Sequence, residues 1–309
     1  MPASGQRILL FANPISGRGQ SVDIAHTIAQ RLRGAGMAVV VCLSRPERQP
    51  LEPSSVDAVV VVGGDGTLRE VAAWMMSRAV KDAAALVPLL VVPVGTANLM
   101  GRHLGIHWSW RRGPHLVLQA LRRQRLMQLD VAWSSAGPCL LVAGVGFDGA
   151  VVHELARLRR GTITRLDYAQ PLLRTAWQYR YPPLSVSVDG RNICRDRRAM
   201  VFIGNVPEYG TGFALLPAAR PDDGLLDVCV VPCNSLVHLA SLLLRAMVGR
   251  LATAPGAVYV KGRTVSIESS VAVPAQIDGE AAGYTPLQIE LLPQRLPMLC
   301  PPAADDVVY

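Results

Sequence analysis

The chain has 309 residues, of which 50% are hydrophobic, and this is enough to build a large core in one or two domains. Lys and Arg number 31 against 23 for Asp and Glu, so the net charge of +8 favours anionic partners such as phosphates, an acidic membrane surface or nucleic acid. Six scattered cysteines without a CxxC pair argue against a disulfide scaffold or a zinc site.

The first 128 residues alternate between strand-like and helix-like segments. Aliphatic runs predict strands at residues 7–12, 37–43, 58–62 and 88–94. Helical spacing between them predicts one helix capped by Ser21 and another whose start carries Thr67 and Glu70 as a T-x-x-E capping box. Continuous aliphatic strands separated by helices predict a parallel sheet covered on both faces.

After residue 129 the pattern changes to short runs with period-two alternation, which predicts an antiparallel β-sandwich. Two helical interruptions are expected, at residues 149–179 and 235–250. The second contains SLVHLASLLLRAMVG, which is apolar enough to face lipid, although a buried core helix is favoured. We therefore predict two domains, 1–128 and 129–309, with the last strand free to return to the first domain.

Three of the predicted strands in the first domain end in turns rich in Gly, Asn, Ser and Thr. These turns are Asn13 to Gly17, Gly63 to Thr67 and Gly95 to Asn98. Because the carboxyl ends of parallel strands lie along one edge of a sheet, the three turns should converge. Glycines let backbone N–H groups approach a phosphate, and the helix N-termini that follow favour negative charge, so the pattern predicts a polyphosphate site.

Asp65 is a carboxylate in the middle of the second turn. A triphosphate would repel it unless it held Mg²⁺, held a water on that ion, or oriented the reacting hydroxyl, so its position indicates phosphoryl transfer. The alternative is that Asp65 only caps a helix, but three matched turns in one domain favour the functional interpretation. No G-x-x-x-x-G-K-[ST] sequence is present, and the G-x-G-x-x-G match at Gly144, Gly146 and Gly149 has antiparallel surroundings, which disfavour a dinucleotide fold.

The order of the motifs carries a family resemblance. NPISGRG, VVVGGDGTLREV and PVGTANLMGRHLGI are followed by GVGFDGAVV, GTGFALLPAARPDDGLLDV and AQIDGEAAG, so the match covers nearly the whole chain. It resembles the diacylglycerol kinase catalytic-domain family, and within it the small bacterial lipid kinases most. The resemblance implies an α/β domain like those of NAD kinases and diacylglycerol kinases that binds ATP, and a β-sandwich domain that faces the lipid.

The resemblance also implies roles for individual residues. The ATP-binding positions would be Asn13, Ser16, Gly17, Arg18, Gly63, Gly64, Asp65, Gly66, Thr67, Leu68, Arg69, Gly95, Thr96 and Asn98. Glu280 matches the position of the proton acceptor, and Asp278 would orient it or the metal, so the catalytic group would be Glu280, Asp278 and Asp65. From the residues alone, Asp278-Gly279-Glu280 is equally a hairpin turn with two exposed acids.

Metal ions are implied in two places. ATP would enter with Mg²⁺, and the segment ARPDDGLLDV matches a structural divalent site formed by the Asp223 side chain and the Arg220 and Leu225 carbonyls. Oxygen ligands suit Mg²⁺ or Ca²⁺, although an acidic turn before a strand explains the same residues equally well. One departure from the family pattern is Leu99, which stands where the third turn commonly carries an acid.

The leading function is an ATP- and Mg²⁺-dependent lipid kinase that phosphorylates a hydroxyl of a diacylglycerol-like or long-chain lipid. An NAD-kinase-like enzyme would share the GGDG turn but would also carry an Asn-Glu dipeptide, which this sequence lacks. A nucleotide- or lipid-binding regulator without turnover is the other alternative, and Leu99 is the hint for it.

The expected partners are a lipid substrate and an anionic membrane, with a homodimer left open. The basic stretch from His153 to Pro182 could lie against lipid headgroups or be a solvated face over a core. Nucleic acid is not expected, because aromatic residues make up only 5% of the chain. A cytoplasmic protein at the membrane periphery is expected, because no secretory signal is recognisable and residues 83–101 are interrupted by Pro88, Pro93 and a polar turn.

Overall fold

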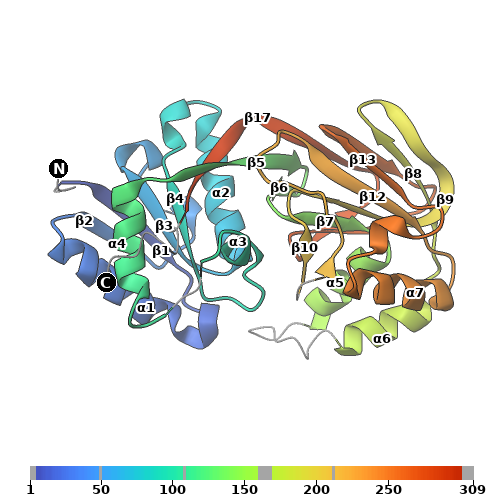
Figure 1. Cartoon of the computed structure of the whole chain (residues 1–309), viewed down its shortest axis with the longest axis horizontal. Helices are drawn as coiled ribbons and strands as arrows, with labels where there is room; N and C mark the ends of the chain where they lie inside the picture. Colours follow the sequence, from blue (N-terminus) through green and yellow to red (C-terminus); the bar gives the residue numbers. More distant parts are fainter. Residues whose placement is uncertain (1–4, 49–50, 107–108, 159–168, 211–212, 301–309) are drawn as a thin grey trace. The chain divides into compact units, whose positions relative to one another are not determined.

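The computed structural model describes residues 5–48, 51–106, 109–158, 169–210 and 213–300, without the side chains of Arg18, Ala169 and Gln170. The chain divides into two compact units (Figure 1). Unit 1 comprises residues 1–129 and 294–309, and unit 2 comprises residues 130–293. Strands β5 (Leu126–Ser134) and β17 (Leu287–Leu299) each contribute residues to both units.

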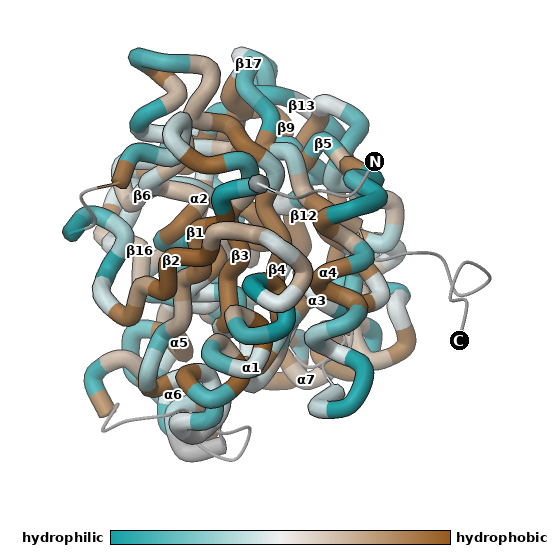
Figure 2. The backbone as a smooth tube through the Cα atoms, turned by 90° about the vertical axis from the view of Figure 1, so that its left-hand side faces the viewer, coloured by the Kyte–Doolittle hydropathy of each residue, from teal (hydrophilic) through white to brown (hydrophobic). Residues whose placement is uncertain are grey.

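Unit 1 is built on a parallel sheet. Its strands are β1 (Arg7–Ala12), β2 (Ala38–Cys42), β3 (Ala58–Gly63) and β4 (Leu89–Pro93), in the order β2-β1-β3-β4. The C-terminal end of β17 pairs with β4 in the parallel sense through Met298 and Leu89. Figure 2 shows β1, β3 and β4 as brown, hydrophobic segments next to one another. The predicted parallel sheet is confirmed.

Helices pack on both faces of this sheet because the side chains of each strand alternate between the faces. Ile8, Leu10 and Val60 share one buried cluster with α1 (Ser21–Gly34) and α4 (Gly113–Arg123). Phe11 makes an edge-to-face contact with Trp74 of α2 (Asp65–Ala79), with ring centroids 5.5 Å apart. Both faces of the strands are therefore buried, which explains their uninterrupted aliphatic sequences.

Two predicted helix caps are wrong. Gln20 is the N-cap of α1, and the Ser21 hydroxyl instead donates to the Asn13 carbonyl. Gly64 is the N-cap of α2, which starts at Asp65, so Thr67 lies inside the first turn and forms no capping box. The Thr67 hydroxyl accepts a hydrogen bond from the Asn13 side chain instead. Ser21 thus closes the first turn onto its own helix, whereas Thr67 joins the second turn to the first, which local sequence spacing does not reveal.

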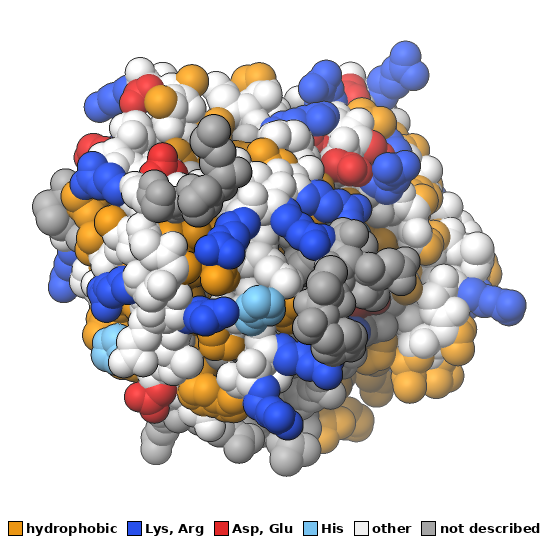
Figure 3. Space-filling model, turned by 60° about the vertical axis from the view of Figure 1, so that its left-hand side comes forward, with side chains coloured by type: hydrophobic (Ala, Val, Ile, Leu, Met, Phe, Trp, Pro, Cys, Tyr) orange, Lys and Arg blue, Asp and Glu red, His pale blue; other side chains and the backbone are white. Residues whose placement is uncertain are grey.

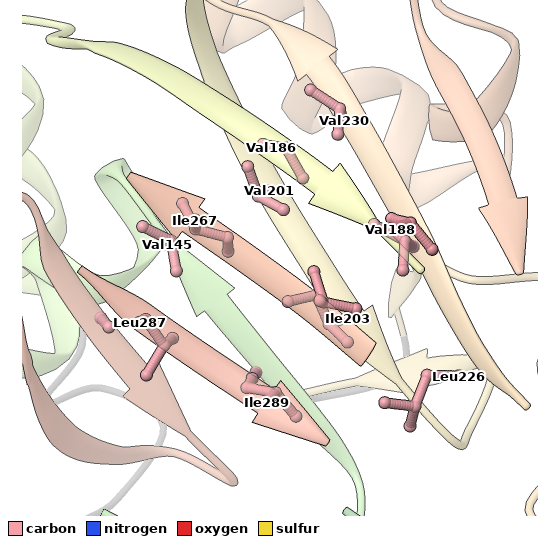
Figure 4. Packing of buried hydrophobic residues seen from close by; sticks show 14 of the residues in the cluster. Val145, Val186, Val188, Val201, Ile203, Leu226, Val230, Ile267, Leu287 and Ile289 are labelled. Carbon is pink, nitrogen blue, oxygen red and sulfur yellow. The ribbon is translucent and has the colours of Figure 1, made fainter. Parts of the chain in front are cut away.

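Unit 2 is an antiparallel β-sandwich, as predicted. Its strands are β6 (Gly137–Cys139), β7 (Val142–Val145), β8 (Pro183–Val188), β9 (Arg191–Gly204), β10 (Glu208–Tyr209), β11 (Phe213–Ala214), β12 (Leu226–Pro232), β13 (Val258–Gly262), β14 (Thr264–Glu268), β15 (Pro274–Ile277) and β16 (Glu280–Tyr284). The first part of β9 pairs with β8, and its last residues pair with β7 and β12. Val186, Ile267 and Ile289 meet Val201, Ile203 and Leu226 in one core (Figure 4).

Three helices belong to unit 2, α5 (Phe147–Leu158), α6 (Ala169–Gln178) and α7 (Leu236–Met247). The preference for α7 as a buried core helix is wrong, because only Leu239, Leu242 and Ala246 of this helix are buried. Part of the basic stretch, residues 159–168, lies outside the described residues. No helix in the described ranges is long and apolar enough to cross a membrane.

The glycine motif in unit 2 serves packing. β7 pairs antiparallel with β9 and β15, which confirms that Gly144, Gly146 and Gly149 do not open a dinucleotide-binding unit. A Cβ on Gly149 of α5 would lie 2.2 Å from the Pro274 carbonyl oxygen, so this helix contacts β15 through backbone atoms.

We expect Gly149→Ala to destabilise the protein by about 2 kcal/mol, because the added methyl group forces backbone to move. Helix propensity alone predicts that Gly149→Ala stabilises the protein, because Ala favours a helix more than Gly does. Gly34→Ala at the end of α1 is the matched control, since a Cβ there meets no atom within 4 Å, and it should stabilise by about 0.5 kcal/mol. Chemical denaturation of both variants tests this, and equal effects would contradict it.

Candidate active site

The three predicted turns follow β1, β3 and β4, which are neighbours in the parallel sheet. The Asn13 side-chain amide donates to the Thr67 hydroxyl over 3.2 Å, which joins the first turn to the second. The Val94 N–H donates to the Gly63 carbonyl over 3.0 Å, which joins the third turn to the second. The turns therefore converge at the carboxyl edge of the sheet, as predicted.

Glycine is required where these turns approach one another. A Cβ on Gly95 would lie 2.6 Å from the Gly64 Cα, so the second and third turns touch backbone to backbone. Gly17 has a φ of +59°, and a Cβ there would lie 2.9 Å from the Val94 carbonyl oxygen. A side chain at Gly17 would therefore meet both a disfavoured backbone conformation and a close contact with the Val94 backbone. The result is a surface of closely spaced backbone groups.

Asp65 connects the second turn to the helix that follows the third. One carboxylate oxygen accepts the Leu99 N–H over 2.9 Å, and the other accepts the Met100 N–H over 3.2 Å, at the start of α3 (Leu99–His103). Burial raises the pKa of Asp65 above its ordinary value, while these backbone hydrogen bonds oppose the rise. Asp65 therefore caps a helix, but it is the helix of the neighbouring turn rather than its own.

The Asp65 contacts also explain how Leu99 is accommodated. The Leu99 backbone donates to Asp65, and its side chain is buried in unit 1. Asn98 has a φ of +51°, and its side-chain oxygen accepts the Gly95 N–H over 2.8 Å, which closes the third turn. The backbone connection between the turns therefore does not depend on an acid at position 99.

The remaining predicted nucleotide-binding residues lie on the same three turns. Ser16 and Gly17 belong to the short helix η1 (Ser16–Gly19), and the Ser16 N–H donates to the Asn13 carbonyl. The Arg18 side chain lies outside the described residues. Leu68 is fully buried, so its side chain belongs to the core. Gly66, Arg69 and Thr96 keep some exposure on the turns.

The start of α2 carries backbone donors at this edge. The first hydrogen bond from the helix to its cap runs from the Leu68 N–H to the Gly64 carbonyl. The N–H groups of Asp65, Gly66 and Thr67 precede it and point along the helix axis away from the helix body. Together with the helix dipole, they make this turn a favourable place for a phosphate.

The predicted hairpin at Asp278-Gly279 is confirmed between β15 and β16, with both residues at positive φ. Asp278 is not an exposed acid, however. Its carboxylate accepts the N–H groups of Leu140, Leu141 and Val142 over 2.9 to 3.1 Å. Glu280, the first residue of β16, is partly exposed. Asp278 has the same partial exposure, so the two acids differ in their backbone contacts: Asp278 holds the hairpin to the start of β7 through three N–H groups.

Asp148 in unit 2 is a site feature that the sequence interpretation missed. Its side chain is half-buried, and its carboxylate accepts hydrogen bonds from the Tyr209 hydroxyl over 2.8 Å and the Gln276 amide over 2.9 Å. The Gln276 side-chain oxygen in turn accepts the Gly279 N–H over 2.8 Å, so the network reaches the hairpin that carries Glu280. Gln276 inside the apolar run VAVPAQI was the available signal, because a buried amide needs polar partners.

The proposed structural metal site does not fit a divalent ion well. The Lys261 ammonium lies 2.8 Å from one Asp223 oxygen and 3.1 Å from an oxygen of the buried Asp227. The other Asp223 oxygen accepts the Leu225 N–H, and Arg220 pairs with Asp222 over 3.5 Å. The described residues contain no cluster of three or more His, Cys, Asp or Glu side chains that could hold a metal. Lys261 already neutralises this turn, so no chemical step is assigned to an ion there.

Two family models match the chain in succession, with the break between them close to the first boundary between the two units. Residues 7–133 match the diacylglycerol kinase catalytic domain, and residues 141–300 match the YegS C-terminal NAD kinase beta sandwich-like domain. The chain belongs to the diacylglycerol kinase and YegS-like family of lipid kinases. The match to the catalytic domain contains the three turns, and the match to the β-sandwich domain contains Asp148, Asp278 and Glu280.

Individual relatives agree with this family. A Xanthomonas euvesicatoria pv. vesicatoria protein named "probable lipid kinase YegS-like" is 31% identical over 252 residues, which cover 80% of this chain and 79% of that protein. A Mycobacterium tuberculosis protein named diacylglycerol kinase is 26% identical, covering 96% of this chain and 95% of its own length. A diacylglycerol kinase structure from Bacillus anthracis has a TM-score of 0.70 at 24% identity over 96% of this chain and 98% of that one, which shows the shared fold.

We expect Asp148 to make the lipid kinase less stable as pH rises. Burial raises the pKa of Asp148 from 3.8 to about 6, so the folded chain binds this proton more readily than the unfolded chain does. The free energy of unfolding should fall by up to about 3 kcal/mol between about pH 4 and pH 6 through this group. In Asp148→Asn, whose amide stays neutral, that part of the pH dependence should vanish.

Denaturant unfolding of both proteins across this pH range measures the difference. Other carboxylates titrate in both proteins, so only the change in the difference between them reports Asp148. Parallel stability curves would show that Asp148 keeps the same pKa on unfolding.

Proposed function

We propose that this lipid kinase transfers the γ-phosphate of ATP, with Mg²⁺, to a hydroxyl of a diacylglycerol-like or long-chain lipid. The observation that carries the proposal is the set of three glycine-rich turns joined by Asn13 and Asp65 at one edge of the unit 1 sheet. A nucleoside triphosphate needs closely spaced backbone donors and a helix N-terminus, and both occur here.

The residues of unit 1 fit this ligand. A Cβ on Gly95 would clash with the Gly64 backbone, so glycine at these positions lets the second and third turns bring their backbone groups close together. MgATP supplies the phosphoryl group, and the metal neutralises its charge. The Leu99 and Met100 N–H groups fix the orientation of the Asp65 carboxylate. Each carboxylate oxygen keeps a further lone pair, with which Asp65 would face the metal.

Glu280 is the proposed general base for the lipid hydroxyl. Glu280 is partly exposed and is the first residue of β16. A general base needs access to the substrate proton and a defined position, and a side chain at the start of a strand has both. Asp278 would hold the hairpin rather than accept the proton, since three backbone N–H groups already stabilise its charged form.

A lipid acceptor implies work at a membrane surface. Basic side chains are spread over the face shown in Figure 3, with acidic ones in only a few places, in line with the net charge of +8. We propose peripheral contact with anionic lipid, because such a charge concentrates the protein at a negative surface. Such contact would hold the kinase at the bilayer that contains its lipid acceptor.

Transfer of labelled γ-phosphate from ATP into a total lipid extract tests the function. The wild type with Mg²⁺ should label a lipid, and a chelator should abolish the label. Glu280→Gln should reduce the rate by about 10²- to 10⁴-fold through loss of the base. Asp65→Ala should reduce it at least as much, because the turns also lose their connection.

The matched control is Glu290→Gln, which removes the same charge from an exposed position of β17 and should leave the rate unchanged. A folded wild type that binds ATP but labels no lipid would refute the lipid acceptor. Equal loss in Glu280→Gln and Glu290→Gln would refute Glu280 as the base.

A further inference from the structure

α7 exposes an apolar face to solvent. Val237, Leu244 and Met247 are 79%, 66% and 66% exposed, and Val248 at the C-cap is 67% exposed. Val237, Leu244 and Val248 follow the spacing of one helical stripe. The buried residues Leu239, Leu242 and Ala246 form another side of the helix, toward the sandwich. α7 is therefore apolar on the side that packs and on the side that does not.

α6 repeats this arrangement. Leu173 and Trp177, four residues apart on one helix face, are 72% and 85% exposed. Among the large hydrophobic side chains of the described residues, seven are at least 66% exposed, and these two helices and the α7 cap carry six of them. Figures 1 and 2 both place α6 and α7 at the same end of unit 2, the lower end in either view. We call these six residues the α6/α7 face.

Four arginines lie on or directly after the two helices of the α6/α7 face. Arg245 lies in the last turn of α7, and Arg250 follows that helix with its side chain exposed. Arg174 lies within α6, where it pairs with Glu154 over 3.4 Å, and the exposed Arg180 follows. Neither helix sequence, AQPLLRTAWQ nor LVHLASLLLRAM, contains an acidic residue.

We propose that the α6/α7 face docks on an anionic lipid bilayer. The inference rests on the proposed function, because it names the surface by which a kinase with a lipid acceptor reaches the membrane. Exposed aliphatic side chains with a tryptophan enter the boundary between headgroups and acyl chains, and neighbouring arginines pair with anionic headgroups. One surface thus supplies both the apolar and the electrostatic part of the binding.

A second copy of the chain fits this face less well than a bilayer does. A two-fold interface brings the same patch of both copies together. Such an interface would bring together the arginines of both copies, including Arg245 and Arg250, and the helix sequences offer no acidic residue to balance them. An anionic bilayer supplies that balance.

The test is sedimentation of the full chain with vesicles, without ATP. The wild type should bind vesicles of phosphatidylcholine with phosphatidylglycerol, and should bind pure phosphatidylcholine vesicles more weakly. Val237→Gln and Leu244→Gln should each weaken partitioning about 10-fold. Arg245→Gln should weaken it about 5-fold on the anionic vesicles alone. Val80→Gln is the matched control, because Val80 is also 79% exposed but lies in unit 1, and it should change nothing.

The same variants separate docking from catalysis. Val237→Gln should keep the wild-type rate of phosphate transfer to a lipid in detergent micelles and lose rate on vesicles. Wild type that fails to sediment with anionic vesicles would overturn the docking proposal even if it phosphorylates micellar lipid. Binding equal to wild type in both α7 variants would also overturn it, as would a wild-type dimer that these substitutions convert to a monomer. If the wild type transferred no phosphate to lipid in micelles, the proposed function would be refuted instead.

Discussion

The hydrogen bonds from the Leu99 and Met100 N–H groups to the Asp65 carboxylate are the interaction on which the candidate site of unit 1 depends. Side chains close individual turns, as Asn98 does in the third, but the position of one turn relative to the next depends on contacts between turns. Asp65 ties the second turn to the helix after the third, and Asn13 ties the first turn to Thr67. The backbone groups of the turns are thus held before any ligand binds, which lowers the cost of ordering them around a triphosphate.

Unit 2 also contains carboxylates that accept hydrogen bonds from backbone N–H groups of a neighbouring segment. Asp278 accepts three consecutive N–H groups at the start of β7, and Asp189 accepts the N–H groups of Arg263 and Thr264 over 2.9 Å each. A carboxylate that accepts several backbone donors is restrained in position. The acids of the Asp189-Gly190 and Asp278-Gly279 turns therefore connect neighbouring segments of the backbone. Glu280 differs from Asp278 in its position, because it begins a strand.

Unit 2 combines a polar network beside its apolar core with apolar side chains on its surface. The half-buried Asp148 connects Tyr209 and Gln276 to the turn before Glu280, while α6 and α7 leave large apolar side chains in water. Both arrangements cost stability in isolation, since removing a carboxylate from water and exposing apolar surface are each unfavourable. A function that uses the Glu280 hairpin and a lipid surface accounts for both costs.

The sequence alone determined the fold class, the order of the strands along the chain and the three turns of unit 1. Hydrophobic periodicity is a local property, and parallel strands must end at one edge, so these predictions needed no tertiary information. The tertiary structure decided what individual polar residues do: Thr67 joins two turns instead of capping, Asp65 caps a neighbouring helix, and Lys261 pairs with the acids of the turn at Asp223. It also decided that one side of α7 is exposed and that Asp148 bonds to Tyr209 and Gln276. Partners far apart in the chain set these roles, and no spacing rule encodes which distant atoms will meet.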